Sequence, residues 1–593
     1  MRSTLIRHIL PAIVCSTSLL FSGGTFADVG MYKKAKGFKS HTVMSKTGNS
    51  LKSRGVTNRK AKSSKSRGWM SKKAKALKSR KGGKVQVIIG YDRFERSELD
   101  ERNEDSRIKG FGGKVDKRFR KLGVRVVSLS PRELEKLSEG KGVHFITTNE
   151  QVSAFSESAR LTAGYASTSA PTPAWMPQVS SNIGVAVIDS GVQTHDDLNV
   201  VSRLDCRVNV SILGGCFTQT FGNFDAFGHG THVAGIIGGD GTASQGVNMG
   251  TAASAQITSL KVLDDDGHGS VLDVLAAIDW ILANGASHNI RVVNMSMGKG
   301  IEESNEIDPL VLAVEQMWDA GIVVVASAGN YGRDGNFSIT SPGNSRKVIT
   351  VGSLTDSSTG NDLTDDYVST YSSRGPTLGD HVLKPDLVAP GNRVIAASKE
   401  SHLRDSIGTC DTCGSDYLAM SGTSMAAPMV AGSVVLMLSQ DPTLTPATVK
   451  ARVMRSARKI AGDATSVGAG VLDIEAALAE TGHMTTEALS PLMIPSETSN
   501  AIILEDTASL WGDATWASSD VWADGYLWAD SSVSADGYLW ADGYLWADGY
   551  LWADGYLWAD GYLWADGYLW ADAVSNGDPL FSQTSGQSFL NDD

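Results

Sequence analysis

Four polar residues of this chain have the side chains and local settings that acyl-transfer chemistry requires: Asp189, His229, Asn330 and Ser424. Ser424 follows Gly422-Thr423 and precedes an apolar run from Met429 to Leu438, which predicts a hydroxyl presented at the start of a helix. A serine in that place caps a helix far more often than it attacks a carbonyl. The chemistry therefore depends on whether a base and an orienting carboxylate are brought to it.

The other three residues stand where predicted strands end or a predicted helix begins. Asp189 follows an apolar run, His229 precedes an apolar helical stretch, and Asn330 ends a short Ser-Ala-Gly-Asn turn. Alone, each has an ordinary structural explanation as a cap, a core histidine or a turn residue. A metal site at His229 and His232 lacks the intervening glutamate and a third ligand. Together the four supply a nucleophile, a base, an orienter for the base and a donor for a developing oxyanion.

Apolar strand-like runs alternate with helical stretches between Pro171 and Ala479. Continuous Val- and Ile-rich strands separated by helices predict an α/β domain, with a parallel sheet covered by helices on both faces. In such sheets the ligand site forms beyond the carboxyl ends of the strands. The predicted strands cover 184–188, 256–262, 291–295, 322–326 and 348–351, and the predicted helices cover 271–283, 309–320 and the run after Pro428.

Three separate motifs occur in this region: Asp189-Ser-Gly, His229-Gly-Thr-His-Val-Ala-Gly and Gly422-Thr-Ser-Met-Ala-Ala-Pro428. In this chain order they resemble the motifs of the subtilisin-like serine proteases (subtilases, peptidase family S8). Asn294-Met-Ser-Met-Gly298 and Lys384-Pro-Asp-Leu-Val-Ala-Pro-Gly391 are similar as well. The resemblance runs from about Ile183 to Ala479 and implies a subtilisin-like fold and endopeptidase activity.

By this resemblance Ser424 attacks a peptide carbonyl, His229 moves the proton, and Asp189 orients the imidazole. Asn330 would face the oxyanion. The substrate would lie extended between two strands, with a broad preference for apolar side chains. The implied substrate-binding residues are Gly267, Gly269, Ser296, Met297, Gly298 and Gly329.

Structural Ca²⁺ is a further implication of the resemblance, with Asp197 as a ligand, whereas no catalytic metal is implied. The loop that would supply the other ligands, Gly239 to Val247, departs from the family's usual pattern in length and in its amide residue. Asp240 is a substitute ligand in that loop. The expectation of calcium therefore concerns the protein more than this particular site.

The two ends of the chain differ in charge, which the net charge of −11 conceals. No acidic residue lies between Asp28 and Asp92, and no Lys or Arg follows Lys459. Residues 1–27 have the pattern of a bacterial export signal, which predicts a secreted or extracellular protein, with cell-surface association as an option. Residues 28–83 predict a disordered basic linker; without interleaved aromatic residues, no nucleic-acid partner is expected.

A small α+β unit is predicted over residues 84–158, ahead of a peptidase domain over 159–480. Lys84 to Gly90 alternates like an edge strand, and Ser130 has the setting of an N-cap before a helix reaching Leu137. The pattern suggests a ferredoxin-like module. The unit resembles the inhibitor-type propeptide of subtilases, which implies a self-processed zymogen with its own propeptide as an intramolecular inhibitor.

Four cysteines remain once the export signal, with Cys15, is removed: Cys206, Cys216, Cys410 and Cys413. An even number in an exported protein predicts disulfides, and local pairing is favoured among the three arrangements that four cysteines allow. A four-thiolate zinc site is the alternative, but Cys206 and Cys216 are too widely spaced for it.

Residues 481–593 form an acidic tail, in which Trp-Ala-Asp-Gly-Tyr-Leu recurs between 516 and 571. On extended backbone a six-residue repeat places Trp, Asp and Tyr on one face and Ala, Gly and Leu on the other. Three interpretations are open: a tail without fixed structure, a stacked solenoid or adhesive module, and a carbohydrate-binding surface. The tail also motivates an alternative function, a surface- or matrix-binding protein with a degenerate protease domain. Against it, no catalytic position is substituted.

Overall fold

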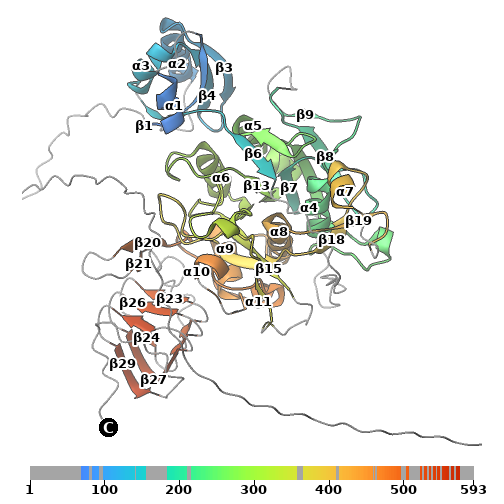
Figure 1. Ribbon diagram of the computed structural model, residues 1–593, viewed down its shortest axis with the longest axis vertical. Coiled ribbons are helices and arrows are strands. Elements are labelled where there is room, and N and C mark those ends of the chain that lie inside the picture. Colours follow the sequence, from blue (N-terminus) through green and yellow to red (C-terminus); the bar gives the residue numbers. More distant parts are fainter. Residues whose placement is uncertain are drawn as a thin grey trace, which may run out of the picture. The chain divides into compact units, whose positions relative to one another are not determined.

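The computed structural model describes residues 69–505 and a set of tail strands between 521 and 574 (Figure 1). Within 69–505 the undescribed residues are 79–82, 92–97, 141, 155–182, 210–214, 357–362, 364, 409–412, 459, 461, 463 and 496–501. The export signal and most of the basic linker lie outside the described residues and stay predictions.

A nine-stranded sheet forms the centre of the large domain, and its inner pairs are parallel. Every residue of its strands β7 and β14 is buried, as expected for strands covered on both faces. The strands in spatial order are β16 (Tyr367–Val368), β15 (Ile349–Thr355), β14 (Val323–Ser327), β12 (Ile290–Met295), β7 (Gly184–Asp189), β10 (Gln256–Lys261), β8 (Val200–Asp205) and β9 (Phe217–Thr218), with β17 (Leu387–Pro390) paired to β15.

Helices cover both faces of this sheet. Helix α4 (His229–Gly238) lies between β9 and β10 along the chain and packs against α8 (Thr423–Gln440). Helices α5 (Val271–Asn284) and α6 (Pro309–Asp319) lead into β12 and β14 and pack against each other. The helices thus form two packed groups, α4 with α8 and α5 with α6. The predicted α/β architecture is confirmed.

Strand β7 lies between β10 and β12, where the direction of the connections reverses. The crevice beyond the carboxyl end of such a strand is where α/β sheets bind ligands. Asp189 is the last residue of β7. The topology therefore places this predicted site residue at the switch point.

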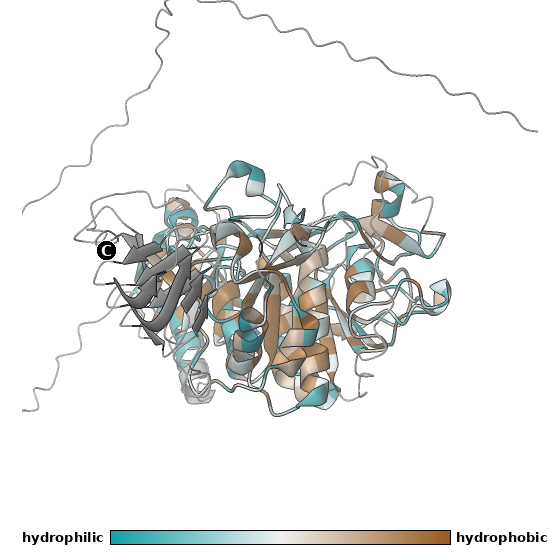
Figure 2. Cartoon of the chain, turned by 90° about the horizontal axis from the view of Figure 1, so that it is seen from below, coloured by the Kyte–Doolittle hydropathy of each residue, from teal (hydrophilic) through white to brown (hydrophobic). Residues whose placement is uncertain are grey.

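Helix α8 (Thr423–Gln440) is the core helix of the domain, packed against α4 and against β12, β14 and β15. Among the described helices it alone is long and apolar enough to cross a membrane, but 83% of its apolar stretch is buried inside the fold. Figure 2 shows hydrophobic residues gathered in the strands and helices at the centre of this domain. The remaining elements are β18 (Val394–Ala397), β19 (Tyr417–Met420), α7 (His402–Ile407), α9 (Pro446–Arg455), α10 (Ala464–Val467) and α11 (Ile474–Ala479).

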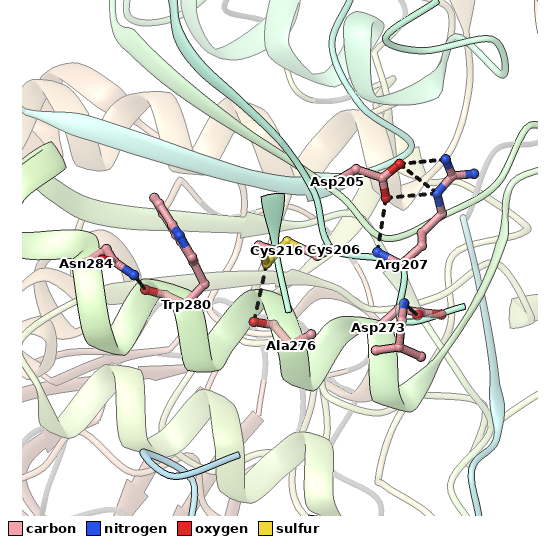
Figure 3. Close-up of a disulfide and its surroundings, with 9 residues drawn as sticks. Asp205, Cys206, Arg207, Cys216, Asp273, Ala276, Trp280 and Asn284 are labelled. Carbon is pink, nitrogen blue, oxygen red and sulfur yellow. Dashed lines mark hydrogen bonds and ion pairs between the residues drawn. A yellow bond between two sulfur atoms is a disulfide. The ribbon is translucent and has the colours of Figure 1, made fainter. Parts of the chain in front are cut away.

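One predicted local disulfide, Cys206–Cys216, lies within the described residues and rests against α5 (Figure 3). The sulfur of Cys216 is 3.5 Å from the carbonyl oxygen of Ala276 on that helix. Cys413 is also disulfide-bonded, and its predicted partner Cys410 lies outside the described residues. Because Cys206 and Cys216 are oxidised, they offer no thiolates for the alternative zinc site.

Residues 69–154 contain the α+β unit, with a five-stranded sheet in the order β1-β5-β2-β4-β3. All of its pairs are antiparallel except β1 with β5. The order β2-α2-β3-β4-α3-β5 along the chain is the ferredoxin-like one that the sequence predicts. The elements are β1 (Trp69–Met70), α1 (Lys72–Leu77), β2 (Val85–Tyr91), α2 (Glu98–Gly110), β3 (Lys114–Phe119), β4 (Val124–Leu129), α3 (Leu134–Ser138) and β5 (Val143–Thr147).

Three expectations about this unit are corrected. The basic linker is ordered from Trp69 to Leu77, because Met70 and Ala74 are buried in the unit's core. Strand β2 is central rather than an edge strand, since it pairs with both β4 and β5. Ser130 makes no side-chain cap, and a short 3₁₀ turn, Pro131–Glu133, precedes α3.

The tail begins with a hairpin of β20 (Leu492–Pro495) and β21 (Ile502–Glu505). The later strands pair in parallel with an offset of three hexapeptides, as where Val521 pairs with Leu539 and Leu539 with Leu557; one shift interrupts β27 with β29. This pairing favours the stacked-solenoid interpretation. The strands are β22 (Val521–Ala523), β23 (Tyr526–Ala529), β24 (Val533–Ala535), β25 (Leu539–Ala541), β26 (Tyr544–Ala547), β27 (Leu551–Ala559), β28 (Leu563–Ala565) and β29 (Leu569–Val574).

Candidate active site

Asp189 and His229 form a buried pair between the end of β7 and the start of α4. Nδ1–H of His229 donates to Oδ1 of Asp189 at 2.8 Å, and both side chains are fully buried. Gly230 permits the approach, because a Cβ there would lie 2.1 Å from the carbonyl oxygen of Gly191. Since the carboxylate accepts the Nδ1 proton, Nε2 of the neutral ring is left as an acceptor.

A second buried aspartate, Asp225, holds the two elements of this pair together. Its Oδ1 accepts hydrogen bonds from the Ser190 hydroxyl and the Gly228 N–H, both at 2.8 Å. Its Oδ2 accepts from the N–H and hydroxyl of Thr231, at 2.8 and 2.5 Å. Burial acts to raise the pKa of Asp225, while these donors oppose that rise. Sequence reasoning missed this residue; its one local signal is an aspartate three residues before a glycine at a helix start.

Ser424, the second residue of α8, is fully buried next to Ser296. Its Oγ–H donates to the carbonyl oxygen of Ser296 at 2.9 Å, and the Ser296 hydroxyl donates to the carbonyl oxygen of Ser424 at 3.0 Å. Within the part of the chain that the structure describes, Nε2 of His229 has no hydrogen-bond partner. The serine and the base are therefore not hydrogen-bonded here, a common state before a substrate is in place.

Asn330 is anchored at one end and open at the other. Its Oδ1 accepts hydrogen bonds from the N–H and the hydroxyl of Thr423, at 3.0 and 2.9 Å. Its Nδ2, although buried, has no partner among the described residues. At the start of α8 the Thr423 N–H donates to Asn330 and the Met425 N–H to the carbonyl oxygen of Gly422, whereas the Ser424 N–H has no acceptor inside the helix. The Asn330 amide and the Ser424 N–H are thus the two donors available to a negatively charged oxygen beside Ser424.

The predicted substrate-binding strands are present, and a segment of the same chain lies between them. β6 (Gln151–Ala154) pairs antiparallel with β11 (His268–Ser270) on one side and with β13 (Met297–Gly298) on the other. Ser153 is opposite His268 and Gly298, and Val152 is opposite Gly269. The Ala154 N–H donates to the carbonyl oxygen of Gly267 at 3.1 Å.

Of the six predicted substrate-binding residues, Gly267, Gly269, Met297 and Gly298 contact β6 through these backbone pairs, while Ser296 binds Ser424. Gly329 has φ of 107°, and its N–H donates to the Thr423 hydroxyl at 3.3 Å. It therefore helps to position the turn that carries Asn330. Ser296 contacts Ser424 and Gly329 contacts Thr423, while the other four contact β6; a role of the six in substrate binding stays a prediction.

Comparison with known proteins places this site in a family. The subtilase family profile matches residues 180–470. Serine protease AprX of Bacillus subtilis (strain 168) is 34% identical over 371 residues, which cover 61% of this chain and 80% of that protein. The chain belongs to the subtilase family. Subtilisin E of the same organism is 31% identical over 394 residues, which cover 66% of this subtilase and 90% of subtilisin E.

The fold of the subtilase is similar to that of a solved structure, fervidolysin from Fervidobacterium pennivorans, a keratinolytic enzyme related to subtilisin. The TM-score is 0.53 at 21% identity, with 74% of this chain and 66% of fervidolysin covered. This likeness concerns the fold alone. Members of the family are serine proteases, which is the chemistry that the geometry around Ser424 suits.

Both carboxylate oxygens of Asp197, the predicted calcium ligand of this subtilase, accept hydrogen bonds from other residues of the chain. Its Oδ1 accepts the Ala243 N–H at 2.7 Å, and its Oδ2 accepts the Tyr417 hydroxyl at 2.5 Å. Across the residues that the structure describes, no group of three or more His, Cys, Asp or Glu side chains is placed to hold a metal ion. Because Ca²⁺ requires six to eight oxygen ligands, Asp197 and its surroundings do not fit such a site.

Asp240, the substitute ligand considered from the sequence, has a different role. Its N–H donates to the carbonyl oxygen of Asp197 at 3.0 Å, and its Oδ1 accepts the Thr242 N–H at 2.9 Å. The loop after α4 is therefore folded on itself and held to Asp197 by hydrogen bonds.

His232, three residues after His229 on α4, is structural in this subtilase. Its Nε2–H donates to the carbonyl oxygen of Leu418 at 2.9 Å, which ties α4 to the strand that leads to Ser424. Burial lowers the pKa of His232 to about 4. A neutral, fully buried ring with this contact is a positioning residue rather than a metal ligand.

Proposed function

We propose that this chain is a secreted serine endopeptidase that hydrolyses peptide bonds through Asp189, His229 and Ser424, by way of an acyl-enzyme. The observation that carries the proposal is the buried hydrogen bond from Nδ1–H of His229 to Oδ1 of Asp189, which leaves Nε2 of the ring as an acceptor for a proton. Nε2 of His229 and Nδ2 of Asn330 have no partner among the described residues, so both are open to a reacting group.

In the proposed reaction the Ser424 hydroxyl leaves the Ser296 carbonyl and gives its proton to Nε2 of His229 as Oγ bonds to the substrate carbonyl carbon. The carbonyl oxygen becomes an oxyanion that accepts from Nδ2 of Asn330 and the Ser424 N–H. Asp189 stabilises the imidazolium through its bond to Nδ1. The proton then passes to the leaving amine, and water releases the acyl group by the same steps in reverse order.

Substrates are proposed to bind as an extended strand between β11 and β13, because β6 occupies that position now. Main-chain hydrogen bonds give such binding little dependence on sequence. Val152 is 1% exposed, whereas its neighbours on β6 are partly or fully exposed. This supports broad specificity with a preference for an apolar residue at the buried position.

The α+β unit is proposed to be the propeptide of a self-processed zymogen, since its own strand β6 fills the substrate position. Ala154, the last described residue of β6, is opposite Met297, the residue next to Ser296, whose carbonyl oxygen accepts the Ser424 hydroxyl. We therefore propose that the first cut follows Phe155, slightly before the predicted boundary at 158.

Structural Ca²⁺ is proposed on the basis of family membership, while both carboxylate oxygens of Asp197 accept hydrogen bonds from protein donors. The parallel pairing of the tail strands supports a folded repeat module at the end of a secreted protease, proposed to bind a surface or matrix. Secretion itself is supported by the N-terminal sequence pattern.

Expression of the full chain with Ser424→Ala tests the function. The variant is expected to accumulate as an uncut precursor with no activity on casein, while the wild type releases a product whose N-terminus is Ser156. Purified Ser424→Ala protein that matures and degrades casein would overturn the proposal. A wild type cut at another bond would overturn only the assigned cleavage site.

A further inference from the structure

The segment Trp69–Leu77 belongs to the α+β unit although its composition is that of a basic linker. β1 adds a parallel strand beside β5, with Trp69 opposite Phe145 and Met70 opposite Ile146. Ser71 caps α1 by accepting the Ala74 N–H at 3.0 Å. Met70 is 4% exposed and Ala74 is fully buried. The segment is therefore an integral part of the unit's core.

Lys73 on α1 reaches out of this unit to the peptidase domain. Its ammonium contacts the carboxylate of Glu302, in the loop before α6, and lies 3.2 Å from Oε1 of Glu150. Glu150 directly precedes β6, and its Oε2 is 3.7 Å from Nζ of Lys299 in the peptidase domain. Lys73 and Lys299 thus hold Glu150 from both sides.

The peptidase side of this contact is strongly acidic. Lys299 is also 3.2 Å from Glu303 and 3.1 Å from Asp308, and the Thr147 hydroxyl donates to Glu303 at 2.8 Å. Together with Glu150 and Glu302, these residues make four carboxylates around two ammonium groups, those of Lys73 and Lys299. Without Lys73, Lys299 alone would face the four carboxylates. Burial acts to lower the pKa of Lys73, but its contacts with Glu302 and Glu150 outweigh burial and raise it.

A cavity next to this cluster shows that the apolar part of the interface is incompletely packed. It has a volume of about 290 Å³ and lies between the sheet of the α+β unit and α6, where Tyr91 and Phe145 face Leu312 and Ala313. Unfilled volume forfeits dispersion contacts. The ionic contacts at the edge therefore contribute a larger share of the binding.

We propose that Trp69–Leu77 is a docking element of the inhibitory unit, which binds the acidic loop before α6 through Lys73 and Glu302. The partner surface is this chain's own peptidase domain, before and after the first cut. The inhibitory unit then begins at residue 69 rather than 84. The proposal rests on the proposed function, because it assumes that the α+β unit inhibits the protease until it is released.

The test uses the full chain and measures the lag between the first self-cleavage, seen by intact mass, and the appearance of activity on a fluorogenic peptide. Since the Lys73–Glu302 pair is partly exposed, Lys73→Ala is expected to shorten the lag about two- to fivefold. Lys73→Glu is expected to shorten it roughly tenfold, because it adds a fifth carboxylate. Lys72→Ala, an exposed neighbour on α1, is the matched control and leaves the lag unchanged.

Charge exchange separates a direct contact from a general loss of folding. Adding Glu302→Lys to Lys73→Glu is expected to return the lag to within about twofold of the wild type. Normal cleavage with an unchanged lag in Lys73→Glu, or no recovery in the double variant, would overturn the docking element and leave the protease assignment intact. A wild type that never cleaves itself would overturn the proposed function, and this inference with it.

Discussion

Asp189 and Asp197 are both buried aspartates at the end of the same strand-and-loop region, yet their surroundings are opposite. Both carboxylate oxygens of Asp197 accept hydrogen bonds, from Ala243 and Tyr417. Asp189 has one oxygen without a partner among the described residues, and so has the outer nitrogen of its partner His229. Leaving a buried polar atom unpaired costs about 1–3 kcal/mol, a cost that Asp197 avoids and Asp189 does not.

The two aspartates have different roles within one domain: Asp197 stabilises the structure, and Asp189 is proposed to act in catalysis. Around Asp197, burial raises the pKa of Tyr417 and its hydrogen bond to Asp197 adds to that rise, which keeps the phenol protonated as a permanent donor. Around Asp189, one carboxylate oxygen and the outer nitrogen of His229 have no partner among the described residues. Substitutions at the two aspartates should accordingly change different quantities, the reaction rate at Asp189 and the free energy of unfolding around Asp197.

Asp189→Asn should produce the largest effect, a fall of about 10⁴-fold in the rate of self-cleavage, because an amide no longer fixes the imidazole tautomer. Gel analysis and intact mass of the full chain over time measure this rate. Asp197→Asn is the matched control and should cleave itself within about tenfold of the wild-type rate. Equal losses in the two variants would erase the distinction between the two sites.

Asn330→Asp should lower turnover on a peptide substrate by at least about 10²–10³-fold, the loss known for a subtilisin that lacks its asparagine donor. The substitution keeps the oxygens that accept from Thr423 and removes only the Nδ2 donor. Asn330→Ala removes both functions and serves for comparison. Retention of near-normal kcat by Asn330→Asp would show that Nδ2 does not contact the oxyanion.

Tyr417→Phe should lower the free energy of unfolding by about 1–3 kcal/mol, because one oxygen of Asp197 is left without its donor. Chemical denaturation in the Ser424→Ala background measures this without self-digestion. Chelation by EDTA should shift the wild type and Asp197→Asn equally, since no ion is expected at Asp197. A chelator effect that disappears in Asp197→Asn would restore calcium to this position.

The buried imidazole of His232 should make the free energy of unfolding depend on pH, because its pKa differs between the folded and the unfolded chain. Its folded pKa, about 4, is below the ordinary value near 6.5, so only the unfolded chain takes up this proton as the pH falls from about 6.5 to 4. The contribution of His232 to the free energy of unfolding is complete above about pH 6.5 and decreases below it. At pH 5 the loss is on the order of 1–2 kcal/mol. Urea denaturation of Ser424→Ala with and without His232→Gln checks this, and identical pH profiles would contradict it.

The sheet and the candidate catalytic residues could be predicted from sequence because their signals are local. Asp189 ends an apolar strand, and the three motifs occur in order. Contacts between distant segments carry no such signal. Tyr417 donates to an oxygen of Asp197 from 220 positions away, so the sequence could not show that this carboxylate has protein donors.

The other differences between the sequence-based predictions and the structure also come from contacts between distant segments. Met70 and Ala74 are the buried residues of a segment otherwise rich in lysine, so its composition hid an ordered strand and helix. The substrate-binding strands were expected, but the occupation of the space between them by β6 depends on how the α+β unit docks. Asp225 accepts hydrogen bonds from Ser190, 35 positions away, as well as from Gly228 and Thr231, and such a distant contact has no signal in the sequence.

The central claim, that Ser424 is a nucleophile activated by His229, is tested most directly by labelling the secreted product of the full chain with a fluorophosphonate. Peptide mapping by mass spectrometry should find one adduct, on Ser424, and His229→Ala should react at least about 10³-fold more slowly. An unlabelled Ser424, or labelling of His229→Ala at the wild-type rate, would contradict the account.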